Sequence, residues 1–388
     1  MKTAADVIVI GGGIVGLSTA YHLAKLGAKK VVVLERDLVG SGSTGRCAGG
    51  IRQQFSTPTS VKISIESVKI YRQFKEEFGA DPDFRENGYL FVARSEKELA
   101  QFRANVATQR ALGVPVDLLP PDDLRKIVPG LNLDGVVGGT FCPTDGYAGP
   151  NEVVQGITRA TRRLGVRVLE GAEVIEVEAT DSRATGVKIK GGEFAAPVIV
   201  CAAGVGSRTV GKMVGLDIPV RPYRRSLFVT QPLPALGPRL PMLYDLTHGF
   251  YMRGEQGGAL LCGGRDLGSS FNTELDWASL DWAAEQATRL IPAIAEAEVN
   301  GGWAGSIDAT PDLNAIMGPA RGLEGFYVAT GFSGHGFMHG PAAGLLMAEL
   351  VLHGKATTVD ISEFALERFA EGHLIKEEMH APFGDEEG

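Results

Sequence analysis

The sequence predicts an α/β fold in which a Rossmann-like domain is interrupted by a discontinuous second domain, built on a mainly antiparallel sheet. Three buried strand patterns run directly into glycine-rich turns, at residues 7–16, 197–207 and 326–337. Parallel strands of such a domain end at one edge of the sheet, so we expect the three turns to meet there. Between the second and third turns, short alternating strands indicate an antiparallel sheet.

The first turn predicts a dinucleotide site. Residues 7–10 form an apolar run, and a helical pattern follows the glycines at 11, 13 and 16. Gly11 allows the tight turn, Gly13 lets a pyrophosphate approach the backbone, and Gly16 lets the helix pack closely on the strand. Glu35 ends the next strand about 20 residues later, where a carboxylate accepts both ribose hydroxyls. These residues alone leave FAD and NAD as alternatives.

The chain leaves the first domain and returns to it twice, which predicts a cleft where the second domain covers the sheet edge. A second glycine-rich loop, residues 40–52, is too long for a simple connection and is expected to contact a ligand. The expected first domain comprises residues 1–80, 149–215 and 318–370, the second domain 81–148 and 216–317, and the C-terminal tail 371–388.

Three helix starts are predicted from local signals. Thr57 and Pro58 are expected to cap and begin a long amphipathic helix that runs to residue 78. Asn151 is expected to cap the next helix, and Pro341 to begin the last apolar one, to residue 352.

Composition excludes several classes of protein. The 388 residues carry a net charge of -8 without a dense basic cluster, which argues against a nucleic-acid partner. Residues 221–225 hold three arginines but are interrupted by Pro222, so we expect a solvated loop. The four cysteines lack metal-ligand spacing and fit a reduced, cytoplasmic location. Neither a signal peptide nor an 18-residue apolar span is indicated.

With these motifs, the chain resembles the D-amino-acid oxidase superfamily of FAD-dependent oxidoreductases. Within it, the chain is most similar to sarcosine oxidase β subunits, dye-linked L-proline dehydrogenase β subunits and glycine oxidases. The resemblance covers nearly the whole chain and is carried by residues 6–16, 34–35, 42–44, 51–52, 202–204, 310–312 and 331–337. It implies FAD as the cofactor. The implied cofactor-binding residues are Gly11, Gly13, Ile14, Val15, Gly16, Glu35, Arg36, Gly42, Ser43, Thr44, Val174, Gly204, Gly331, Gly334, His335, Gly336, Phe337 and Met338.

The resemblance also implies a substrate site. Arg52 matches the arginine that holds the substrate carboxylate in the sarcosine oxidase branch, and its alternative is a surface ion pair. The helix after His335 would aim its free amides at the flavin, a role in which the His335 backbone matters more than its imidazole. Tyr251 and His248 are candidates for the opposite wall, or are structural aromatics.

Four positions depart from the resembled enzymes. Arg46 and Gly305 stand where relatives carry the histidine or cysteine that links the flavin, so FAD is expected to be non-covalent. Met338 stands where monomeric sarcosine oxidases have lysine. Leu261 aligns, without gaps, with a lysine near the flavin N5 of oxidases, which makes an acceptor other than oxygen slightly favoured.

The expected reaction takes a hydride from the carbon beside the nitrogen of an amino acid or secondary amine, giving an imine that water hydrolyses. The electron acceptor is expected to be oxygen, a quinone or a partner subunit, in a homo- or hetero-oligomer. One alternative is a 2-hydroxy-acid dehydrogenase, which needs a base, with His248 as the candidate. A second is a flavin-binding assembly protein without turnover.

Overall fold

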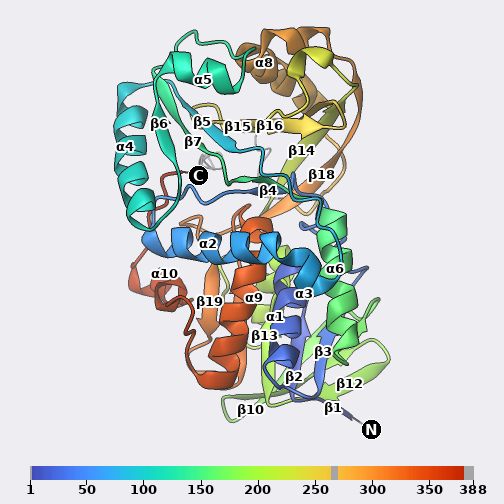
Figure 1. Cartoon of the computed structure of the whole chain (residues 1–388). Helices are drawn as coiled ribbons and strands as arrows, with labels where there is room; N and C mark the ends of the chain where they lie inside the picture. The colour runs from blue at the N-terminus through green and yellow to red at the C-terminus, as the bar shows by residue number, and fades with distance from the viewer. Residues whose placement is uncertain (1, 264–269, 380–388) are drawn as a thin grey trace.

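The computed structural model describes residues 2–263 and 270–379. Two large sheets dominate it: a mostly parallel sheet among helices in the lower half of Figure 1, and a mostly antiparallel sheet in the upper half. The α/β fold class and the two kinds of sheet predicted from the sequence are therefore confirmed.

The parallel sheet has the strand order β19-β20-β13-β2-β3-β9, in which only β19 and β20 pair antiparallel. The chain order reverses between β13 and β2, and this is where ligands bind in open α/β sheets. The strands are β2 (Val7–Ile10), β3 (Val31–Leu34), β9 (Arg167–Leu169), β13 (Val198–Cys201), β19 (Ile316–Pro319) and β20 (Phe326–Thr330).

Helix α1 packs directly on α9, because α9 presents glycines to it. A Cβ atom on Gly344 would lie 2.4 Å from the Cβ of Ser18, and one on Gly340 would lie 2.8 Å from the Ile14 side chain. The helices of this half are α1 (Ile14–Lys25), α2 (Pro58–Arg72), α3 (Phe74–Phe78), α6 (Pro150–Arg163), α7 (Ser207–Lys212), α9 (Gly336–His353) and α10 (Arg368–Glu371). A small sheet joins β1 (Thr3–Ala4), β12 (Gly192–Ala195), β11 (Arg183–Ile189) and β10 (Val174–Thr180).

The eight-stranded sheet has the order β18-β14-β17-β16-β15-β5-β7-β6, and only β15 and β5 pair parallel. Its strands are β5 (Tyr89–Ala93), β6 (Asp117–Leu119), β7 (Gly138–Cys142), β14 (Arg221–Thr230), β15 (Met242–Asp245), β16 (Phe250–Glu255), β17 (Gly258–Cys262) and β18 (Val299–Ala309). Helices α4 (Glu96–Ala111), α5 (Pro121–Ile127) and α8 (Leu280–Leu290) belong to this half, and a short ribbon pairs β4 (Gly50–Ile51) with β8 (Gly146–Tyr147).

The domain boundaries stay a prediction, which the strand distribution supports. Strands before residue 80 and between 166 and 201 lie in the parallel and small sheets, apart from β4, and strands between 89 and 142 lie in the eight-stranded sheet. Strand β19 begins at Ile316, two residues before the expected return at 318. Of the expected tail, residues 380–388 lie outside the described chain.

Two of the predicted helix starts are wrong, and the third is right. Thr57 does cap α2, since its side chain accepts from the Ser60 amide, but the expected long helix is divided at Gln73 into α2 and α3. Asn151 is not a cap, because Gly149 takes that position and Pro150 begins α6. The last helix begins at Gly336, five residues before Pro341.

The proline inside α9 is tolerated because another residue replaces its missing amide. Pro341 cannot donate to the carbonyl of Phe337, four residues earlier. The hydroxyl of Tyr71 donates to that carbonyl oxygen instead, at 2.7 Å. The first turn of α9 therefore extends to the sheet edge and is fixed by α2.

The predicted solvated loop at 221–225 is also wrong, since these residues begin strand β14. Around Pro222 this strand pairs with β18, whereas its pairing with β17 starts at Leu227. On the other side the Ser270 amide donates to the Pro222 carbonyl oxygen at 2.9 Å, which a proline allows because it lacks only the amide hydrogen. The arginines of this stretch thus belong to the sheet.

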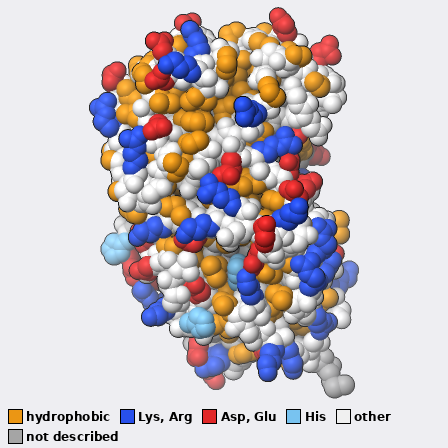
Figure 2. All heavy atoms as spheres, viewed as in Figure 1, with side chains coloured by type: hydrophobic (Ala, Val, Ile, Leu, Met, Phe, Trp, Pro, Cys, Tyr) orange, Lys and Arg blue, Asp and Glu red, His pale blue; other side chains and the backbone are white. Residues whose placement is uncertain are grey.

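The surface carries mixed charges on the face shown in Figure 2, where acidic and basic side chains are interspersed. Within residues 2–263 and 270–379, no helix is long and apolar enough to cross a membrane. The same residues contain no cluster of histidine, cysteine and acidic side chains that could hold a metal ion.

Candidate functional site

One large cavity, with a volume of about 1090 Å³, runs from the first glycine turn to the inner face of the eight-stranded sheet. This exceeds the roughly 300–1,000 Å³ typical of sites for small molecules and suits a dinucleotide together with a substrate. The predicted residues that line it are Gly11, Gly13, Ile14, Val15, Glu35, Arg36, Gly42, Ser43, Thr44, Arg52, Val174, Gly204, Tyr251, Gly334, His335, Gly336, Phe337 and Met338.

The glycines of the first turn have distinct roles. Gly11 has a φ of +112°, and a Cβ there would lie 2.3 Å from the carbonyl oxygen of Ala202. A Cβ on Gly16 would lie 2.1 Å from the Gly11 carbonyl oxygen, so Gly16 serves packing and does not line the cavity. A Cβ on Gly13 would meet only the Thr44 hydroxyl, at 3.2 Å. Gly13 therefore leaves room for a ligand at the start of α1.

The carboxylate of Glu35 lies beside this turn. One of its oxygens accepts from the Gly12 amide at 2.6 Å and the other from the Asp37 amide at 2.8 Å. A carboxylate offers about four acceptor positions, so two amides leave capacity for ribose hydroxyls. Glu35 is thus held in place with acceptors available to the cavity.

The third glycine turn brings the start of α9 to the cavity. Gly336, Phe337 and Met338 line the wall, and the first amides of a helix have no partner within the helix. Gly331, in contrast, lies outside the lining, and its amide donates to Asp308 Oδ2 at 2.8 Å. This end of the cavity therefore favours negative charge.

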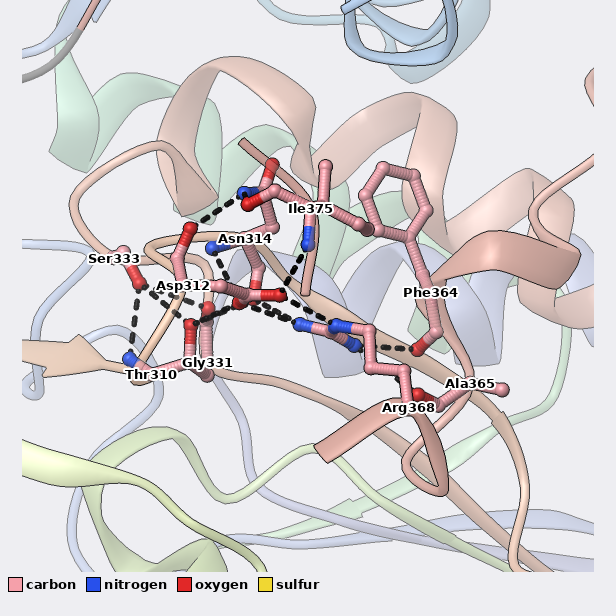
Figure 3. Close-up of polar contacts among 9 residues, drawn as sticks. All are labelled: Thr310, Asp312, Asn314, Gly331, Ser333, Phe364, Ala365, Arg368 and Ile375. Carbon is pink, nitrogen blue, oxygen red and sulfur yellow. Dashed lines mark hydrogen bonds and ion pairs between the residues drawn. The ribbon is translucent and has the colours of Figure 1, made fainter. Parts of the chain in front are cut away.

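A buried polar network stabilises the turn at residues 331–334 (Figure 3). The Arg368 guanidinium forms two hydrogen bonds to the Asp312 carboxylate, at 2.7 and 2.8 Å, and both side chains are almost fully buried. The Thr310 hydroxyl reaches Asp312 at 3.2 Å, and the Thr310 amide donates to the Ser333 hydroxyl at 3.1 Å. The motif at 310–312 is thus structural: it joins the end of β18 and the 331–334 turn to the C-terminal segment.

Arg52 is buried in the cavity wall, with 3% of its surface exposed. Its guanidinium donates to the carbonyl oxygens of Gln54 at 2.7 Å and Met379 at 2.8 Å, and it contacts His335 Nε2 at 3.0 Å. Because arginine has no acceptor, His335 accepts through Nε2. The burial of Arg52 does not fit a surface ion pair, and within the described residues no carboxylate pairs with this cation in the cavity wall.

Aromatic residues from the eight-stranded sheet form the opposite wall. Tyr251 stacks on Tyr244 with ring centroids 5.5 Å apart, and both line the cavity together with Tyr89. Burial raises the pKa of Tyr251 well above its usual value, so its hydroxyl stays protonated.

His248 does not belong to this site. It precedes β16, lies outside the cavity lining, and contacts Asp245 Oδ2 at 3.0 Å and Arg289 Nη1 at 2.9 Å. The prediction failed because His248 and Tyr251 are close in sequence, whereas only Tyr251 lies on the strand face that turns inward.

Leu261 is the second residue that the prediction misplaced. Leu227 and Tyr251 line the cavity, and their strand partner is Cys262. Leu261 pairs with Phe228 instead and is buried with it in a core on the other side of the sheet. A shift of one residue along a strand exchanges its two faces, so the matching to a lysine at the flavin fails here.

Arg46 and Gly305 face each other in the cavity wall. A Cβ atom on Gly305 would lie 3.0 Å from the Cβ of Arg46. The Arg46 side chain donates to the Ser41 carbonyl oxygen at 3.0 Å and the Ala304 carbonyl oxygen at 3.3 Å. The two positions thus form one place in the structure, although 258 residues separate them in sequence.

Sequence reasoning missed several residues of the cavity. Burial raises the pKa of Asp308 to about 6, although the amides of Gly331 and Phe332 donate to its carboxylate. Arg225 lines the cavity from β14, the stretch taken for a loop. Correct strand assignment at 221–230 and 299–309 would have placed both on the sheet.

A family model described as FAD dependent oxidoreductase matches residues 6–350. The chain belongs to the FAD dependent oxidoreductase family. Its fold is similar to the crystal structure of L-proline dehydrogenase from P. horikoshii, with a TM-score of 0.91 and 33% identity, covering 97% of this chain and 100% of that one. It is also similar to glycine oxidase from Geobacillus kaustophilus, with a TM-score of 0.84 and 26% identity over 95% and 99% of the two chains.

Curated relatives include longer proteins. The chain is 30% identical to mitochondrial dimethylglycine dehydrogenase of Rattus norvegicus, covering 91% of this chain and 44% of that protein. It is 30% identical to mitochondrial sarcosine dehydrogenase of Homo sapiens, over 95% and 42%. The chain thus spans less than half the length of these two dehydrogenases. FAD-dependent oxidoreductase domain-containing protein 1 of Bos taurus is 31% identical over 96% of this chain and 86% of its own length.

The cavity fits the FAD on which this family depends. Gly13 leaves space at the start of α1 that would admit the phosphates, and Glu35 keeps acceptors free beside it. Gly204, where a Cβ would meet nothing within 4 Å, faces the cavity from the end of β13. These residues would hold the nucleotide end, and the start of α9 would lie at the flavin. The family match confirms the expected cofactor, FAD.

Proposed function

We propose that this chain oxidises an amino acid or secondary amine, such as sarcosine, proline or glycine, at the carbon beside its nitrogen. The observation that carries the proposal is Arg52, a buried cation in the cavity wall without a carboxylate partner among the described residues. A buried charge is costly unless it is paired, so the site favours an anionic ligand there. A substrate carboxylate meets that requirement.

The protein would act mainly by binding and orientation. Arg52 would hold the carboxylate, and the stacked Tyr244 and Tyr251 would close the opposite wall and exclude water. Bound FAD would supply the hydride acceptor. Loss of the hydride from carbon would let the nitrogen lone pair of the neutral amine complete a C=N bond, giving an iminium ion that releases its N–H proton to water, so no protein base is strictly needed. Water then hydrolyses the released imine.

The start of α9 supports this chemistry. Gly336, Phe337 and Met338 line the cavity, and their position in the first turn of a helix favours negative charge beside them. Charge that develops on the flavin N1 and C2 carbonyl during reduction would be stabilised there. His335 contributes in two ways, through its position before the helix and through its contact with Arg52.

The other cofactor-binding residues and the acceptor remain proposals. FAD is expected to be non-covalent, because Gly305 has no side chain and the Arg46 side chain is bonded to backbone carbonyls. The acceptor would be oxygen, a quinone or a partner subunit of a homo- or hetero-oligomer. With Leu261 outside the cavity, the argument against oxygen rests on Met338 alone.

A cytoplasmic location is also a proposal, supported by four cysteines that all lack a disulfide partner. Two of the relatives are mitochondrial by name, so fractionation of the source cells decides this point.

Anaerobic reduction of the bound flavin tests the proposal against its alternatives. A panel of sarcosine, proline, glycine and other amino acids should bleach the flavin absorbance, and 2-hydroxy acids should not. The 2-hydroxy-acid alternative loses its expected base, since His248 lies outside the cavity. A flavin that no amino acid reduces, in protein with a full FAD content, would favour an assembly protein without turnover.

A further inference from the structure

A C-terminal segment, residues 375–379, runs from the buried network of Figure 3 to Arg52, which lines the cavity. The Ile375 amide donates to Asp312 Oδ2 at 3.1 Å, and the Asn314 side chain donates to the Ile375 carbonyl oxygen at 3.2 Å. Four residues later, the Met379 carbonyl oxygen accepts from Arg52 Nη2. The segment is therefore anchored at one end and touches the buried arginine at the other.

Glu377 fixes the middle of the segment to the loop that carries Arg52. Its Oε1 accepts from the Ser56 amide at 3.1 Å and from the Ser56 hydroxyl at 2.9 Å. The same oxygen accepts from the Met379 amide at 2.8 Å. One carboxylate therefore holds Met379 in register with Arg52.

The contact with Met379 changes which hydrogens Arg52 can offer. A guanidinium binds a carboxylate bidentately through Nε with Nη2 or through Nη1 with Nη2, so both forks use Nη2. The two hydrogens of Nη2 are directed to His335 Nε2 at 3.0 Å and the Met379 carbonyl oxygen at 2.8 Å. Neither fork is complete while both acceptors stay in place.

Of the two acceptors, Met379 is the one that a ligand could displace from Arg52. His335 stands at the start of α9, its amide donates to the Phe332 carbonyl oxygen at 2.9 Å, and its ring packs edge-on against Phe55. Met379 belongs to a short segment whose hydrogen bonds to the rest of the protein involve Ile375, Glu377 and the Glu378 amide. Its side chain is buried in the same cluster as Tyr89, Met242 and Tyr244, all of which line the cavity. Movement of Met379 would thus alter both the arginine and the wall.

We propose that residues 375–379 gate the substrate carboxylate: the Met379 carbonyl occupies Arg52 Nη2 until a carboxylate displaces it and completes a bidentate fork. This inference rests on the proposed binding of a carboxylate at Arg52. It assigns to the C-terminal segment a part in setting which anions the site admits.

Acetate binding to the FAD-loaded protein, followed by the change in the visible flavin spectrum, tests the gate. Glu377→Gln removes the charge that clamps Met379, and Ser56→Ala removes the hydroxyl that meets the same carboxylate. Both variants should bind acetate about three- to tenfold more tightly than wild type, the worth of roughly one hydrogen bond. Glu378→Gln is the matched control, because among the described residues the Glu378 side chain pairs with Lys376 alone. The acetate affinity of this variant should be that of wild type.

The outcomes separate the gate from the site. If Glu377→Gln and Ser56→Ala bind acetate as wild type does, or more weakly, the proposed gate is wrong. This holds even if Arg52→Met abolishes acetate binding, a result that would support the carboxylate site itself. If Arg52→Met binds acetate as wild type does, the carboxylate site itself fails, and the gate with it.

Hydrogen exchange gives an independent readout in wild type. The Met379 amide should exchange faster when acetate is bound, because the displaced segment loses its contact with Glu377. Slower exchange with acetate would show that the segment closes on the ligand, and would overturn the proposal.

Discussion

The hydroxyl of Tyr71 in α2 donates to the carbonyl oxygen of Phe337 in α9, the carbonyl that Pro341 leaves without a helical partner. Both groups are buried, and the ring of Tyr71 also packs against that of Phe337. Through this bond, a residue of a distant helix fixes the turn that the flavin would contact.

Tyr71→Phe should therefore destabilise the FAD-loaded protein by about 1 to 3 kcal/mol, the usual cost of leaving a buried carbonyl unpaired. The ring packing is retained, so the loss reports on the hydroxyl. Pro341→Ala restores an amide that can donate to Phe337, and should recover much of this loss in the double variant. Thermal or urea unfolding of the four proteins measures the effect, and equal losses with and without proline would contradict the account.

The flavin should be released entirely by acid precipitation, as FAD. Gly305 offers no atom for a covalent link, and the Arg46 side chain is engaged with backbone carbonyls. The measurement compares flavin absorbance in the supernatant and in the washed pellet. Yellow colour that stays with the pellet would refute the non-covalent assignment.

Because of His22, we expect the free energy of unfolding to depend on pH. Burial lowers the pKa of His22 to about 4, and its Nε2 atom has no hydrogen-bond partner among residues 2–263 and 270–379. Since the unfolded chain binds the proton with a pKa near 6.5, stability is lost as pH falls from about 6.5 through 4. From pH 7.5 to pH 5 this residue should remove on the order of 2 kcal/mol.

His22→Leu should abolish that part of the pH dependence and stabilise the protein by about 1 kcal/mol at pH 7.5, since an unpaired buried nitrogen is removed. His353→Leu, at the exposed end of α9, is the control. The comparison needs unfolding curves at both pH values with excess FAD. A His22→Leu protein that loses as much stability as wild type between pH 7.5 and 5 would contradict the lowered pKa.

The sequence is sufficient for those parts of the site that depend on local pattern. Gly11, Gly13 and Glu35 occur within one strand-turn-helix-strand unit, and their spacing determines their geometry. The position of Arg52 after a glycine-rich loop, together with the family resemblance, predicted that it lies at the cavity.

Features that depend on strand register or on distant segments could not be predicted in this way. The strand face of Leu261 changes with a shift of one residue. Arg225 was missed because Pro222 indicated a loop where strand β14 begins. Pro341 resembles a helix start, because a proline within a helix leaves a carbonyl oxygen without its amide donor. Here Tyr71, 270 residues earlier in the sequence, donates to that carbonyl oxygen of Phe337. Met379 meets Arg52 across 327 residues of sequence. Such contacts follow from packing and leave no local signal.

The most direct measurement is anaerobic flavin reduction by an amino acid and by the same amine without its carboxylate: sarcosine against dimethylamine, proline against pyrrolidine. Wild type should favour the amino acid, and Arg52→Met should lose about 2 to 5 kcal/mol of that preference, as expected for a desolvated ion pair. Arg52→Lys should not rescue it, because an ammonium cannot form the two-bond fork. If the amino acid reduced the flavin of an FAD-loaded Arg52→Met protein as fast as that of wild type, the assignment of Arg52 and the proposed substrate class would be contradicted.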